Sequence, residues 1–129
     1  MAGEPSANPL RILVADDRRD AGRIMKVLLE RSGHEVVVVE NLASALDSAR
    51  QFRPHVIISD IALEALRDGC ELARNVRDDP SLPRPRLIAV TGYDDEDTRR
   101  DALDSGFDHF LVKPPAIQEL LDILAKVQP

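Results

Sequence analysis

Five short apolar runs, separated by longer amphipathic stretches, dominate the chain from Leu10 onward. They occupy Arg11–Ala15, Val36–Val39, Val56–Ser59, Leu87–Val90 and Phe107–Val112. All but the last are continuous rather than alternating, which is typical of strands that are covered on both faces of a parallel sheet. The pattern therefore predicts five buried strands.

The stretches between these runs carry apolar residues at helical spacing. In the first of them the spacing of Ile24, Val27 and Leu28 indicates a packed helix face, and Asn41 is the expected N-cap of the second. The predicted helices cover residues 20–31, 42–51, 70–78, 94–104 and 115–127.

Strict alternation of strands and helices with short connections predicts an α/β fold. Right-handed crossovers between parallel strands give a three-layer αβα sandwich with one five-stranded parallel sheet. Residues 1–9 are rich in Ala, Pro, Ser and Asn, and we expect a flexible tail or linker there, followed by one domain over 10–129. The spacer Asp79–Arg86 carries three prolines and is expected to be a loop.

Composition narrows the function classes. Among 129 residues, 17 Lys and Arg oppose 23 Asp and Glu, for a net charge of −6, which argues against a basic nucleic-acid or membrane contact. No apolar run approaches the roughly 20 residues of a membrane span. One cysteine, Cys70, excludes an internal disulfide framework. With no signal-peptide pattern at the N-terminus, we expect a cytoplasmic location.

Polar chemistry follows four of the five predicted strands. The first run ends in Asp16-Asp17, the third in Asp60, the fourth in Thr91 and the fifth in Lys113. Ligands of open parallel sheets bind at the carboxyl ends of the strands. We therefore expect three carboxylates, a hydroxyl and an ammonium group to converge on one edge of the sheet.

Three carboxylates within about 5 Å repel one another by a few kcal/mol per pair at an effective dielectric near 20. Such a cluster persists when a cation binds it or when a pKa rises. Lys113 supplies one positive charge, and Mg²⁺, which prefers carboxylates, waters and a phosphoryl oxygen, would supply more. The set therefore predicts a Mg²⁺-dependent site for a phosphoryl group attached to, or passing through, a carboxylate.

The sequence resembles the receiver domain of two-component response regulators over residues 10–127. The resemblance rests on the joint spacing of six motifs: ILVADD at 12–17, GHEV at 33–36, PHVIISDI at 54–61, DGCELAR at 68–74, VTG at 90–92 and FLVKP at 110–114. It implies a flavodoxin-like fold with strand order 2-1-3-4-5.

The resemblance also implies roles for individual residues. Asp60 matches the phosphoacceptor, and Mg²⁺ would be held by Asp16, Asp17, Asp60 and the carbonyl of residue 62, which is Ala62. Thr91 matches the hydroxyl that engages the phosphoryl group, Lys113 the lysine that pairs with it, and Phe110 the aromatic switch. The bond from Lys113 to Pro114 would be cis. Under this resemblance Asp60, Thr91 and Lys113 carry the chemistry.

The loop after Asp60 departs from the family pattern. Position 64 is Glu where a Pro is usual, and Asp68-Gly69 lie one residue further on than usual. We expect residues 62–67 to form an irregular or single-turn helical excursion. Ala62 and Tyr93 stand where polar groups often orient a hydrolytic water, so Tyr93 is expected to control access to the site and self-dephosphorylation is expected to be slow.

The leading hypothesis is a phosphoacceptor rather than a conventional enzyme. Its expected partners are a histidine kinase or histidine phosphotransfer protein and a downstream protein that binds the helix 4–strand 5–helix 5 face, the receiver itself being a monomer or weak dimer. The chain is either a stand-alone regulator or a receiver cut from a longer protein. The alternatives are a Mg²⁺-dependent aspartyl-phosphate phosphohydrolase, a degenerate receiver that acts only as a binding module, and a flavodoxin-like cofactor binder, which the carboxylates of Asp16 and Asp17 disfavour.

Overall fold

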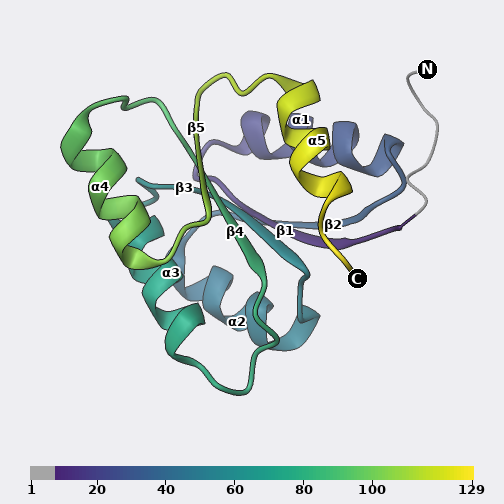
Figure 1. The fold of residues 1–129 in the computed structure, drawn as a ribbon, viewed down its shortest axis with the longest axis horizontal. Coiled ribbons are helices and arrows are strands. Elements are labelled where there is room, and N and C mark those ends of the chain that lie inside the picture. The colour runs from purple at the N-terminus through teal and green to yellow at the C-terminus, as the bar shows by residue number, and fades with distance from the viewer. Residues whose placement is uncertain (1–7) are drawn as a thin grey trace.

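The computed structural model describes residues 8–129, so most of the tail expected over 1–9 lies outside the described residues. Strands and helices alternate along this part of the chain (Figure 1). In chain order they are β1 (Arg11–Ala15), α1 (Arg19–Arg31), β2 (Glu35–Val39), α2 (Leu42–Phe52), β3 (Val56–Asp60), α3 (Asp68–Asp78), β4 (Arg86–Thr91), α4 (Glu96–Ser105), β5 (His109–Val112) and α5 (Ile117–Ala125).

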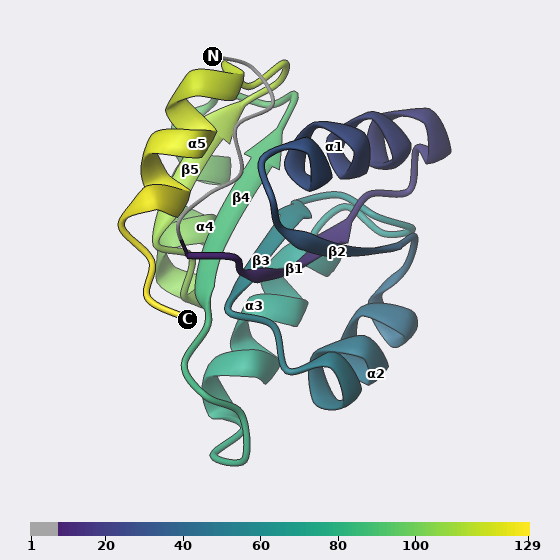
Figure 2. The same cartoon turned by 90° about the vertical axis from the view of Figure 1, so that its right-hand side faces the viewer.

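All strands are parallel and lie in the order β2-β1-β3-β4-β5, which confirms the predicted fold class. Helices α1 and α5 cover one face of the sheet, and α2, α3 and α4 cover the other (Figures 1 and 2). The carboxyl ends of the strands therefore share one edge of the sheet, and the amino ends share the opposite edge.

Each face of the sheet has its own apolar core. Leu13, Ile57 and Leu87 belong to the core under α2, α3 and α4, whereas their chain neighbours Ile12 and Ile58 belong to the core under α1 and α5. Successive strand residues point to opposite faces, and both faces are buried. This is why the strands appear in the sequence as continuous apolar runs.

The packed face of α1 differs from the expectation. Ile24 is 62% exposed and Val27 and Leu28 are also exposed, whereas Gly22 and Leu29 are buried. Apolar residues occupy two adjacent stripes on this helix. Ile24 and Leu28 belong to one, and Gly22, Met25 and Leu29 belong to the other. The stripe that contains Gly22 packs on the sheet because it brings the helix closest to Val38.

Several element ends also differ from the expectation. β5 begins at His109 rather than Phe107, because Gly106, in the left-handed region at φ 119°, ends α4 and turns Phe107 into the core. Asp95 caps α4 by accepting from the N–H of Thr98 at 2.8 Å. Asn41 caps α2 as predicted. Among the described residues, none of the helices combines the length and apolar character that crossing a membrane requires.

Candidate functional site

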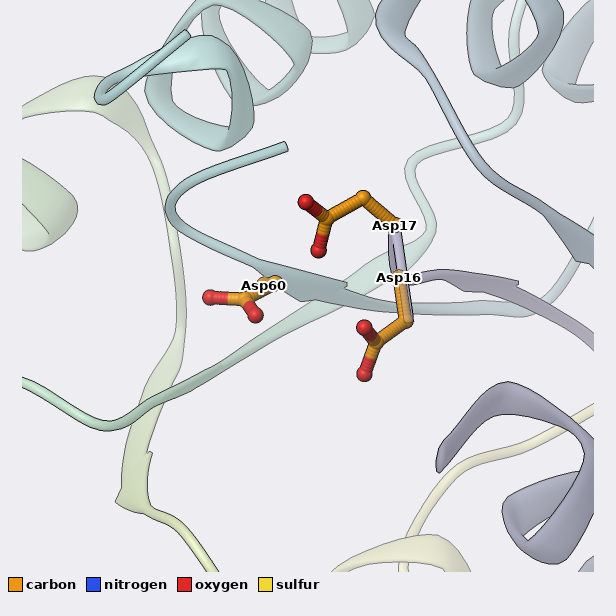
Figure 3. A group of neighbouring side chains, drawn as sticks. All are labelled: Asp16, Asp17 and Asp60. Carbon is orange, nitrogen blue, oxygen red and sulfur yellow. The ribbon is translucent and has the colours of Figure 1, made fainter. Parts of the chain in front are cut away.

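Three carboxylates meet at the carboxyl edge of the sheet (Figure 3). Asp16 and Asp17 directly follow β1, and Asp60 is the last residue of the neighbouring strand β3. One oxygen from each side chain can be chosen so that all lie within 4.8 Å of one another. Figure 3 shows the side chains of Asp16 and Asp17 leaving the chain in different directions while both carboxylates turn toward Asp60.

Lys113 joins this cluster from the end of β5. Its Nζ donates to Oδ2 of Asp60 at 2.7 Å and to Oδ2 of Asp16 at 3.0 Å. The Lys113 backbone N–H donates to the carbonyl of Thr91 at 2.8 Å, and the bond to Pro114 is cis, as the resemblance implied. The long side chain thus spans the end of β4 to reach the carboxylates.

The cluster holds more negative than positive charge. Burial raises the pKa of Asp60, and the Asp16 charge adds to this effect, while Lys113 opposes it. Burial lowers the pKa of Lys113, but the hydrogen bonds to Asp60 and Asp16 and the negative charges of these two groups together outweigh burial and raise it. A set of carboxylate oxygens with one ammonium group fits Mg²⁺, which takes hard oxygen ligands.

Asp16 and Asp17 occupy different environments. Asp16 is buried, and its Oδ1 accepts the N–H of Arg18 at 2.9 Å, so its carboxylate is held by both Arg18 and Lys113. Asp17 is exposed. A metal ion at this edge would therefore have open solvent access on the Asp17 side.

The backbone after Asp60 is held tightly against α3. The N–H of Ala62 donates to Oδ1 of Asp60 at 3.3 Å, and the N–H of Gly69 donates to the carbonyl of Ile61 at 2.7 Å. A Cβ on Gly69 would clash with the carbonyl oxygen of Asp60, so only glycine fits there. Residues 61–67 contain bends and a turn but no regular helix, which confirms the irregular path.

Thr91 and Tyr93 lie together at the end of β4. Thr91 is fully buried, and its Oγ1 accepts the N–H of Tyr93 at 3.2 Å. The Tyr93 residue is 55% exposed, so solvent reaches much of its surface.

Two contacts at α4 were missed by the sequence reasoning. The guanidinium carbon of Arg99 lies 4.6 Å from the ring centroid of the half-buried Phe110. Arg67, in the loop after Asp60, donates to Oδ2 of Asp101 at 3.2 Å and to Oγ1 of Thr98 at 3.3 Å. Both contacts join separate elements, and no spacing within one segment of the sequence could reveal them.

A groove of about 560 Å³ adjoins the carboxylates. Asp16, Asp60 and Lys113 line one end, and the rest is largely apolar surface of α1 and of the segment before α5, including Ile24, Leu28, Pro114, Pro115 and Ile117. The apolar residues that α1 does not pack on the sheet are thus gathered beside Asp60.

Comparisons with known proteins agree with this geometry. A family model described as the response regulator receiver domain matches residues 12–125. The response regulator MprA of Mycobacterium sp. strain KMS is 34% identical over 114 residues, which cover 88% of this chain but 48% of MprA. The chain thus spans about half the length of this relative.

The match covers nearly the whole length of a second relative and of a solved structure. The response regulator DivK of Brucella anthropi is 27% identical over 90% of this chain and 94% of its own. The receiver domain of sensor histidine kinase PA1611 from Pseudomonas aeruginosa PAO1 has a TM-score of 0.82 and 27% identity, covering 92% of this chain and 97% of its own. That structure has a magnesium ion coordinated in its active site cleft.

Proposed function

This chain belongs to the response regulator receiver domain family, and we propose that it accepts a phosphoryl group on Asp60 in a Mg²⁺-dependent step. The donor would be a phosphohistidine of a histidine kinase or histidine phosphotransfer protein. The observation that carries the proposal is the contact of Lys113 with both Asp60 and Asp16 inside a cluster of three carboxylates. The receiver domain would span residues 10–129.

The transfer needs little from the chain beyond positioning and charge. An Asp60 oxygen attacks phosphorus, the phosphorus–nitrogen bond of the donor breaks, and the imidazole nitrogen keeps the electron pair. Lys113, which contacts Asp60, would balance charge on the phosphoryl oxygens, and the Thr91 hydroxyl would donate to one of them. Mg²⁺ held by Asp16, Asp17, Asp60 and the Ala62 carbonyl would supply the remaining positive charge.

The same event would switch the α4–β5–α5 face. When the Thr91 hydroxyl moves toward the phosphoryl group, Phe110 gains room to turn inward and leaves the Arg99 contact. Arg67 ties the loop after Asp60 to α4, so a loop shift would also reach this face. The change in partner affinity follows from the population shift between the two arrangements.

The groove beside Asp60 is the surface that we propose for the phosphodonor. Its apolar residues on α1 suit a protein surface, and Asp60 at its carboxylate end would accept the phosphoryl group of a donor bound there. Such a donor and a receiver would meet in the cytoplasm. We propose a monomer or weak dimer that catalyses its own phosphoryl transfer and does not turn over external substrates.

Incubation with a small-molecule phosphodonor and Mg²⁺, followed by intact mass measurement, tests this proposal. We expect a single phosphoryl adduct on the wild type and on the matched Asp104→Asn variant, whose carboxylate is exposed on α4. Asp60→Asn should lose the adduct while the protein stays folded. An unchanged adduct on Asp60→Asn would overturn the assignment, and rapid multiple turnover would favour the phosphohydrolase alternative.

A further inference from the structure

About half of the Lys and Arg side chains of this acidic chain form ion pairs with carboxylates. Within residues 8–129, eight Lys and Arg side chains form ion pairs with carboxylates: Arg19, Arg50, Arg67, Arg74, Arg77, Arg99, Arg100 and Lys113. Five of the unpaired ones line a single cavity of about 480 Å³: Arg11, Arg53, Arg84, Arg86 and Lys126. Five of the nine cations without an ion pair among the described residues therefore line one cavity, and the other four, Arg18, Arg23, Lys26 and Arg31, lie on α1 or at its N-cap.

This cavity lies at the amino edge of the sheet, opposite Asp60. Arg11 and Arg86 open the strands β1 and β4, Arg53 follows α2, and Lys126 follows α5. The same parallel topology that gathers carboxylates at one edge gathers these cations at the other. No carboxylate side chain belongs to the described residues that line the cavity; the other lining residues are His55, Pro54, Pro83, Pro85, Val127, Gln128 and Pro129.

Several of these groups are held in place before any ligand arrives. Arg11 donates to the carbonyls of Phe52 and Arg53, at 3.0 Å from Nε and 2.7 Å from Nη2 respectively. The backbone N–H of Arg11 donates to Nδ1 of His55 at 2.8 Å, so a neutral His55 carries its proton on Nε2 and offers a donor. Arg84 stands between Pro83 and Pro85, whose rings fix the local backbone.

Two of the nearby carboxylates, Asp79 and Asp108, are already engaged, whereas Glu119 and Asp122 line a neighbouring cavity together with Arg86 and Lys126. Asp79 accepts from the N–H and hydroxyl of Ser81 and pairs with Arg50, while Asp108 pairs with Arg77 at 2.7 Å. The positive field reaches the neighbouring groups, since the charge of Arg11 adds to burial in lowering the pKa of His55.

We propose that this cavity, lined by Arg11, Arg53, Arg84, Arg86, Lys126 and His55, binds a compact polyphosphate group of a nucleotide or of inorganic polyphosphate. Guanidinium groups match phosphate oxygens in a planar, bidentate manner, and the cavity volume lies within the range of small-molecule sites. The cations converge on one cavity instead of forming a stripe, and the rest of the chain is more acidic than its net charge of −6, which disfavours a long nucleic acid. The site goes beyond the phosphoacceptor function and does not depend on it.

Calorimetric titration of the full chain with inorganic tripolyphosphate and with ATP, in metal-free buffer, tests the site. We expect one ligand per chain, with affinity about tenfold or more above that for orthophosphate, because several cations act together. Arg84→Ala and Lys126→Ala, both at exposed positions, should each weaken binding severalfold. Equal affinity for ATP and tripolyphosphate would identify the polyphosphate itself as the ligand, and tighter ATP binding would identify a nucleotide.

The matched controls are Arg23→Ala and Arg31→Ala, which each remove from α1 one exposed cation that has no ion pair within residues 8–129 and does not line the cavity. They should leave the affinity unchanged, and Asp60→Asn should also bind normally. The proposal is overturned when the α1 variants weaken binding as much as the cavity variants do. It is also overturned when orthophosphate binds as tightly as tripolyphosphate, or when a single-stranded RNA binds more tightly than either polyphosphate.

Discussion

The two edges of the sheet carry opposite chemistry. At the carboxyl edge, three carboxylates face the single ammonium group of Lys113. At the amino edge, five cations line a cavity to which no described carboxylate side chain contributes. Parallel topology explains both clusters, because residues that are distant in sequence but adjacent to strand ends must share an edge.

The length of the strands keeps the two edges independent. A strand of five residues such as β1 spans about 16 Å, and charges in 0.15 M salt are screened over about 8 Å. An anion at the amino edge therefore changes the field at Asp60 little. A small acidic domain can thus hold a cation site and an anion site without either neutralising the other.

Metal affinity gives the largest expected contrast between the edges. Asp17→Ala should weaken Mg²⁺ binding at least about tenfold, or about 1.4 kcal/mol, because it removes the exposed carboxylate of the cluster. Arg84→Ala at the opposite edge should leave Mg²⁺ binding unchanged. The rise in melting temperature with Mg²⁺ concentration measures both affinities. Equal Mg²⁺ binding by wild type and Asp17→Ala would refute the metal site.

The lifetime of the phosphorylated state tests the carboxyl edge more finely. Water must attack phosphorus in line, and the methyl side chain of Ala62 offers no polar group to orient it. Ala62→Asn would add one orienting hydrogen bond of ~1–2 kcal/mol and should accelerate decay about five- to thirtyfold. Tyr93→Ala should also accelerate decay, because it opens the path of water to the site. Leu66→Ala, at an exposed position of the same loop, is the matched control. Decay at the wild-type rate in both test variants would show that neither position limits hydrolysis.

Sequence reasoning recovered the carboxyl edge but not the amino edge. Asp60 and Thr91 are the last residues of strands and Asp16 and Lys113 directly follow strands, so the sequence predicts that they share an edge. Arg11 and Arg86 begin strands in the same way, but the net charge of −6 gives no sign of a local group of cations. Net charge is a property of the whole chain, whereas a binding site depends on the local distribution of charge.

Helix α1 shows a second limit, which concerns the prediction of a packed helix face from hydrophobic periodicity. In α1, apolar residues occupy both the stripe of Ile24 and Leu28 and the stripe of Gly22, Met25 and Leu29, so helical periodicity alone could not choose between them. Tertiary packing chose the second stripe, because Gly22 allows a close approach to Val38. The stripe left exposed lines the groove beside Asp60.

The contact between Arg99 and Phe110 tests whether binding at Asp60 is coupled to the arrangement of Phe110 on β5. A cation–π contact at a site that solvent reaches contributes about 0.5–1 kcal/mol, so Arg99→Ala should favour the inward Phe110 arrangement about two- to fivefold. Tighter binding of beryllium trifluoride, a phosphoryl mimic, would measure this shift. Arg100→Ala is the matched control, because Arg100 pairs with Asp97 on the exposed surface. Equal effects of the two substitutions would assign the change to net charge instead.

Acid is expected to change the free energy of unfolding least, and the groups at the two edges change it in opposite directions. At the amino edge, Nδ1 of the buried His34 accepts the N–H of Leu10 at 3.0 Å, and burial lowers the pKa of His34 below its ordinary value of 6.5. As pH falls below 6.5, the unfolded chain takes up a proton that folded His34 resists, so the free energy of unfolding decreases. Burial raises the pKa of Asp60 at the carboxyl edge, so protonation there favours the folded state instead.

His34→Asn isolates the contribution of His34 to the pH dependence of the free energy of unfolding. An amide oxygen can accept the Leu10 N–H but does not titrate. Urea unfolding at pH 7.5 and pH 5 should show a larger loss of stability for the wild type than for His34→Asn. Asp60 and the remaining histidines are common to both proteins, so their contributions cancel in the comparison. An identical loss in the two proteins would mean that His34 takes up its proton equally well folded and unfolded, and that the amino edge owes none of its acid sensitivity to this hydrogen bond.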